Sequence, residues 1–63
     1  MVQYRCYLLD GAGAIRGVET VDGIDDMHAL VEARELLIER RQYVGFELWL
    51  RNRRICVEAR ELI

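Results

Sequence analysis

The chain has 63 residues, a net charge of −2 and two cysteines, and all nine of its basic residues are arginine. A chain of this length forms one domain, residues 1–63, and buries only about 60% of its unfolded surface, so self-association would help to stabilise it. The composition argues against a secreted disulfide scaffold, because Cys6 and Cys56 lie in apolar strand-like runs, and free thiols are expected.

The first predicted strand covers about residues 3–9, where aromatic and apolar side chains dominate. Strand alternation places Tyr4, Cys6 and Leu8 on one face. Because that face is entirely apolar, we assign it to the core.

A turn and a second strand are expected next. The glycines of residues 11–17 suit a tight turn, and the second strand is expected over about residues 14–21. Its apolar residues fall three apart, which indicates a bulge near Gly17. The glycine run partly follows the dinucleotide-binding fingerprint, but Arg16 stands where the third glycine is needed and no helix pattern opens there. A hairpin tip is therefore expected.

One helix is predicted over about residues 26–42, with Asp25 and Asp26 at its positive end and Gly45 at its exit. Its core face is expected to carry Ala29, Leu30, Ala33, Leu36 and Leu37. A second apolar strip lies beside this face and consists of Met27, Val31 and Ile38. The two strips together are wider than contact with one small sheet requires.

The last two strands are expected over about residues 46–50 and 54–58, followed by a tail at 59–63. The third strand is expected to face the core with Phe46, Leu48 and Leu50. Ile55 and Val57 are expected to join the core, although a longer turn between the strands would reverse that assignment.

These elements predict an α+β fold of the order ββαββ. The four strands form an antiparallel sheet in the order 2-1-3-4, and the helix packs on one face through a right-handed connection. The opposite sheet face is left uncovered. That face carries Tyr7, Leu9 and Trp49.

Catalytic and metal-binding groups are scarce in this chain. It has no serine and a single threonine, Thr20, and neither cysteine has a histidine nearby in the predicted topology. His28 and Glu32 belong to an acidic helix stripe and together offer too few nitrogen or sulfur ligands for zinc. We therefore predict a protein with no enzymatic activity, no cofactor and no metal.

The leading functional hypothesis is a self-associating protein-interaction module, most simply a homodimer, with an unknown protein as another possible partner. The expected interface residues are Tyr7, Leu9, Trp49, Met27, Val31 and Ile38. The start of the chain has no signal-peptide pattern and no membrane-spanning stretch, so a cytoplasmic location without membrane contact is expected.

The alternative hypothesis is a nucleic-acid-binding accessory protein. Its contacts would be the aromatic and basic residues of the last hairpin, Trp49, Arg51, Arg53 and Arg54. Aromatic side chains stack with bases and arginines pair with phosphates. The negative net charge and the acidic helix argue against this hypothesis at the level of sequence.

Four segments, YRCYLLDGAGAIRG, DDMHAL, GFELW and RNRRICV, are similar to those of small alphaproteobacterial proteins of the rhizobial type. The resemblance spans about residues 4–57 and implies the same ββαββ fold, in a family with no established activity. Residues 50–52 depart from the glycine-containing turn of those relatives, which leaves the register of the last hairpin open. The tail after residue 57 lies outside the resemblance.

The sequence VEAREL occurs twice, at residues 31–36 and 57–62. The segments before the two copies are unrelated, so a duplicated fold is not indicated. We expect the first copy to be helical and the second to begin as a strand and end as a docked tail with Leu62 and Ile63.

Overall fold

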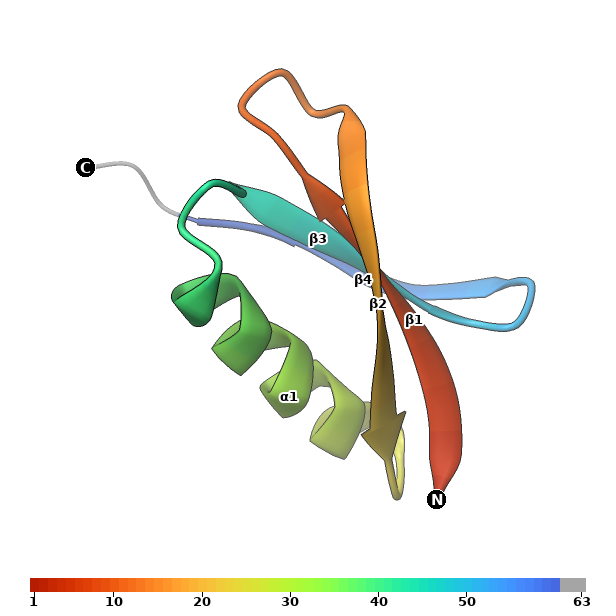
Figure 1. Cartoon of the computed structure of the whole chain (residues 1–63). Coiled ribbons are helices and arrows are strands. Elements are labelled where there is room, and N and C mark those ends of the chain that lie inside the picture. Colours follow the sequence, from red (N-terminus) through yellow and green to blue (C-terminus); the bar gives the residue numbers. More distant parts are fainter. Residues whose placement is uncertain (61–63) are drawn as a thin grey trace.

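The computed structural model describes residues 1–60. The elements are β1 (Val2–Leu9), β2 (Ile15–Gly23), α1 (Asp26–Glu39), β3 (Gly45–Leu50) and β4 (Arg53–Ala59). The strands form one antiparallel sheet in the order β2-β1-β3-β4, and α1 crosses one face of it (Figure 1). The predicted α+β fold, element order and strand order are confirmed.

The core lies between α1 and the sheet face that it covers. Its fully or nearly buried members are Tyr4, Cys6, Leu8, Val21, Ala29, Ala33, Leu37, Phe46 and Leu48. Leu30, Leu36 and Leu50 are partly buried against this cluster, as is Tyr43 from the turn after α1. Small alanines on α1 let the helix lie close to the large side chains of β1 and β3.

Asp10 organises the turn between β1 and β2. Its carboxylate accepts hydrogen bonds from the backbone N–H groups of Ala12 and Ala14, at 2.9 and 3.0 Å, and from Arg16 Nε at 2.8 Å. The bond from Arg16 is the main reason that the pKa of Asp10 lies below its usual value. The glycine-rich run is therefore a hairpin tip, as predicted.

The predicted bulge near Gly17 is confirmed. Leu8 pairs with Gly17 and Leu9 with Ile15, so Arg16 is the extra residue in β2. The bulge places Ile15 on the same uncovered face as Val18, although the two are three residues apart, while Val21 points into the core.

Asp25 is the N-cap of α1, and its side chain accepts a hydrogen bond from the His28 N–H at 2.8 Å. The helix ends at Glu39, three residues before the predicted end. The prediction was wrong because the chain must return at once to the sheet. The Val44 N–H donates to the Leu9 carbonyl at 2.8 Å, immediately before β3 begins at Gly45.

The assignment of Val57 to the core was wrong, and its cause is a bulge in β4. Leu48 pairs with Cys56 while Trp49 pairs with Arg54, so Ile55 is the extra residue. Ile55 and Cys56 are both partly buried against the core. Val57 falls on the uncovered face and is 47% exposed. Strand β4 also continues to Ala59, past the predicted end at residue 58.

The two VEAR segments adopt different structures and contact each other. The first lies inside α1, and the first three residues of the second end β4. Arg34 of the first forms a bidentate ion pair with Glu58 of the second, at 2.8 and 2.6 Å, and this contact lowers the pKa of Glu58. Arg60 donates to the Leu37 carbonyl near the end of α1. The expected docking of Leu62 and Ile63 lies outside the described residues.

Candidate functional site

The uncovered sheet face carries a row of polar and aromatic side chains that crosses all four strands. In the strand register, Thr20 of β2 pairs with Arg5 of β1, Arg5 pairs with Trp49 of β3, and Trp49 pairs with Arg54 of β4. Directly opposed residues of an antiparallel pair lie on the same face, with their Cβ atoms about 5 Å apart. The indole of Trp49 is therefore flanked by an arginine on each neighbouring strand.

The Trp49 ring is held in a fixed orientation by two contacts. Its Nε1–H donates to Glu47 Oε1 at 3.0 Å. The ring also meets Tyr7 edge to face, with centroids 6.4 Å apart and planes at 89°. Both aromatic side chains remain partly exposed. The face thus presents two positioned aromatic rings.

The arginines predicted to surround the last hairpin divide between the two faces. Arg53 lies on the helix side, with its guanidinium 3.6 Å from Asp26. Arg54 lies beside Trp49 on the uncovered face. Arg51 is in the turn, where its φ of 55° is in the left-handed region that favours glycine or asparagine.

Arg5 was missed at the sequence level. It is separated from Trp49 by most of the chain, and only the β1–β3 register brings the two together. The alternation of β1 already placed Arg5 on the face opposite Tyr4 and Cys6, and this was the one available signal.

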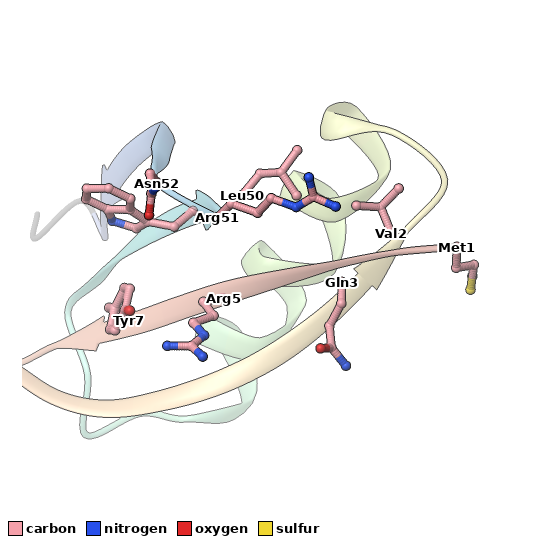
Figure 2. Close-up of a pocket in the computed structure, with 9 residues that line it drawn as sticks. Met1, Val2, Gln3, Arg5, Tyr7, Leu50, Arg51 and Asn52 are labelled. Carbon is pink, nitrogen blue, oxygen red and sulfur yellow. The ribbon is translucent and has the colours of Figure 1, made fainter.

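A hollow of about 840 Å³ lies beside Trp49, between the N-terminal half of β1 and the β3–β4 hairpin, and Val2 and Leu50 of the helix-side face also line it. It forms because β3 pairs with β1 only as far as Arg5, while β1 continues alongside β2 to Val2. Figure 1 shows the β3–β4 hairpin turning away from the start of β1. Figure 2 shows the lining residues; the polar and aromatic ones are Gln3, Arg5, Tyr7, Trp49, Arg51 and Asn52.

Leu9 does not contribute an exposed surface to this face. Its partners in the register are Ile15 and Gly45, and it is only 9% exposed. The expectation of an uncovered Leu9 was therefore wrong, since alternation along a strand identifies the face and not the depth of burial.

The second apolar strip of α1 is exposed. Met27 and Ile38 are 65% and 67% exposed, and Val31 is 42% exposed. All three lie on the outer side of the helix, away from Ala29 and Ala33, which are completely buried. We call these three residues the α1 strip.

Neither cysteine has the environment of a reactive thiol. Burial raises the pKa of Cys6 to about 11, and burial also raises the pKa of Cys56. Both cysteines are free. Each pairs with Leu48 from the strand on either side of β3, so their Cα atoms are two strand spacings, roughly 9–10 Å, apart. This separation is too large for a disulfide bond.

His28 makes local contacts on α1. Its Nδ1 accepts a hydrogen bond from the Ile24 N–H at 3.1 Å, and its Nε2 lies 3.5 Å from Glu32. Within residues 1–60, no three His, Cys, Asp or Glu side chains come together as a metal site would require.

These observations define a small ββαββ protein with one aromatic and basic sheet face and one exposed apolar helix strip. Comparisons with protein-family models, with curated proteins and with solved structures give no match for this chain. The resemblance to small alphaproteobacterial proteins stays a prediction. Among the described residues, no helix has the length and apolar character needed to cross a membrane.

Proposed function

We propose that this chain is a non-catalytic protein-interaction module that pairs with a second copy of itself through the α1 strip. One observation carries the proposal: Met27, Val31 and Ile38 are exposed together on one side of a helix. Exposed apolar side chains that gather on one surface usually mark an interface. The opposite side of the helix already packs on the sheet, so these residues have no role in the core.

The spacing of the strip suits an antiparallel pairing of two α1 helices. The midpoint of the strip falls between Glu32 and Ala33. Met27 and Ile38 are the same number of residues from this midpoint, and so are Val31 and Arg34. A two-fold axis at that point would set Met27 against the partner's Ile38, and Val31 against the partner's Arg34. The guanidinium of Arg34 is already paired with Glu58, which leaves its aliphatic stem for packing.

The other expected interface residues, which lie on the uncovered sheet face, are the weaker candidate for this contact. Leu9 is nearly buried, and Tyr7 and Trp49 already pack on each other. Arg5 and Arg54 interrupt the apolar surface there and would lose hydration in a face-to-face dimer. The α1 pairing includes one arginine, Arg34, whose guanidinium is already paired with Glu58.

The test measures mass against concentration by sedimentation or light scattering. The native chain is expected to shift from 7.4 kDa towards twice that mass as concentration rises. Ile38→Glu places a charge in the proposed contact and is expected to raise the dimer dissociation constant at least tenfold, which is about 1.4 kcal/mol. The variant should fold, because Ile38 is exposed and glutamate is a good helix former.

Val18→Glu is the matched control, since Val18 is also more than half exposed but lies on the sheet face. It should leave association unchanged. A native chain that remains a monomer at high concentration would refute self-association. Loss of the dimer in Val18→Glu but not in Ile38→Glu would move the interface to the sheet.

A further inference from the structure

We infer that the uncovered sheet face binds single-stranded nucleic acid, with Trp49 as the stacking surface and Arg5, Arg51 and Arg54 as phosphate contacts. This surface is separate from the α1 strip, so the inference does not depend on self-association. Three observations support it: the arginines that have no carboxylate within 4.0 Å among residues 1–60, the orientation of the Trp49 indole, and the distribution of charge between the two faces.

The arginines around Trp49 differ from most of the others in their partners. Four arginines elsewhere have a carboxylate within 4.0 Å; these are Arg16, Arg34, Arg40 and Arg53. Within residues 1–60, no carboxylate lies that close to Arg5, Arg51 or Arg54. Of the described acids, two share this face: Glu47, which is bonded to the Trp49 indole, and Asp22, which pairs with Gln3 in the register. Three exposed arginines with no carboxylate within 4.0 Å among residues 1–60 therefore lie on Trp49's neighbouring strands or in the turn that follows it.

The negative net charge comes mostly from the helix side, because the uncovered face of the described chain carries two acids, Asp22 and Glu47, against Arg5, Arg54 and the turn residue Arg51. The acidic stripe of α1 lies on the helix side of the molecule, as does Glu58, which pairs with Arg34. Asp26 neutralises Arg53 on that side. A polyanion at the opposite face would meet a local excess of positive charge.

The geometry favours a flexible strand with unstacked bases over other anions. Trp49 is already oriented by Glu47 and Tyr7, so stacking a base on it costs little ordering of the protein. The hollow beside it is within the roughly 300–1,000 Å³ range of ligand sites. Gln3 and Asn52 line it with amide donors and acceptors that suit base edges (Figure 2). A duplex would offer no unstacked base to this site.

The experiment titrates the full chain with an oligothymidylate of about 15 nucleotides. Trp49 is the only tryptophan, so quenching of its fluorescence reports stacking directly. Repeating the titration between about 50 and 200 mM salt should give a slope of log K against log salt of roughly −2, the value for three phosphates on a single strand. No quenching and no salt-dependent binding would overturn the inference.

Arg54→Gln and Arg41→Gln form a matched pair for the charge contribution. Both remove one exposed arginine that has no carboxylate within 4.0 Å among residues 1–60, but Arg41 lies in the turn after α1. Arg54→Gln is expected to weaken binding and to reduce the salt slope by about 0.7, and Arg41→Gln to change neither. Equal effects of the two variants would overturn the assignment of the face.

Trp49→Leu tests the stacking contribution by anisotropy of a labelled oligonucleotide. It is expected to weaken binding by roughly 5- to 150-fold, the usual range for loss of one base–aromatic stack. If this variant does not fold, the arginine pair still decides the question. Equal affinity for a duplex of the same length, or for heparin, would overturn the single-strand assignment, because neither presents an unstacked base.

Discussion

Phe46→Ala is expected to lower the free energy of unfolding by about 3–5 kcal/mol, the usual cost of truncating a buried aromatic side chain. Phe46 is completely buried in β3, one of the two central strands, in the cluster under α1. A domain of 63 residues is stable by only roughly 3–9 kcal/mol. This single change should therefore leave a large unfolded population at 25 °C. Urea unfolding followed by circular dichroism measures the loss.

Ile24→Ala is the control for Phe46→Ala. Ile24 is 71% exposed just before α1, and its truncation should change stability by less than about 0.5 kcal/mol. A loss of under about 1 kcal/mol in Phe46→Ala would mean that β3 does not pack under α1 as described.

Gly45→Ala is expected to destabilise the protein by about 1–3 kcal/mol, although it adds one methyl group. A Cβ at Gly45 would lie 2.6 Å from the Glu58 carbonyl oxygen and 3.2 Å from the Ala59 Cα. Both atoms belong to the backbone of β4, which cannot rotate away as a side chain would. The strands must separate, and the pairing that holds β4 at the sheet edge must weaken. Thermal or urea unfolding measures the effect.

Gly11→Ala makes the same chemical change at a position with free space. A Cβ there would meet no atom within 4 Å, and the φ of Gly11 is not positive. Its stability should be unchanged or raised by up to about 1 kcal/mol, through the unfolded chain. Similar losses in the two variants would contradict the close approach of β3 and β4 at Gly45.

The fold was predictable because its signals are local and agree with one another. Tyr4, Cys6 and Leu8 alternate as a central strand does, and all three are buried. Asp25 was recognised as a cap from its residue type and its position before the helical pattern. With one helix between two hairpins, few strand orders remain, and the right-handed connection selects among them.

The ends and the register of β4 were less predictable, since they depend on contacts across the sheet. The bulge at Ile55 reverses the alternation and cannot be seen in the residues themselves. Gly45 resembled a signal for the end of the helix. In the structure, its lack of a side chain allows the backbone of β4 to lie close to β3. Tertiary pairing, and not local preference, decides both positions.

The two VEAR segments illustrate the same limit. Identical residues form a helix turn at Val31 and a strand at Val57, so their local preferences cannot choose the structure. The second segment follows a strand and pairs with β3, while Arg34 of the first reaches Glu58 of the second.

The candidate surfaces were predicted in part. Trp49, Arg51 and Arg54 do gather near one another, because they are close in sequence. Arg5 joins them only through the β1–β3 register, and Arg53 leaves them because pairing with Leu50 turns it to the helix side. A sequence gives the residue types of a surface more readily than it gives their grouping.

The most direct test of two separate surfaces is a pair of nuclear magnetic resonance titrations on one labelled sample. Diluting the protein is expected to shift the amide signals of Met27, Val31 and Ile38. Adding an oligothymidylate to the dilute protein is expected to shift those of Arg5 and Tyr7 and the Trp49 indole N–H. Shifts of the sheet-face signals on dilution, or shifts of the same residues in both titrations, would contradict two separate surfaces.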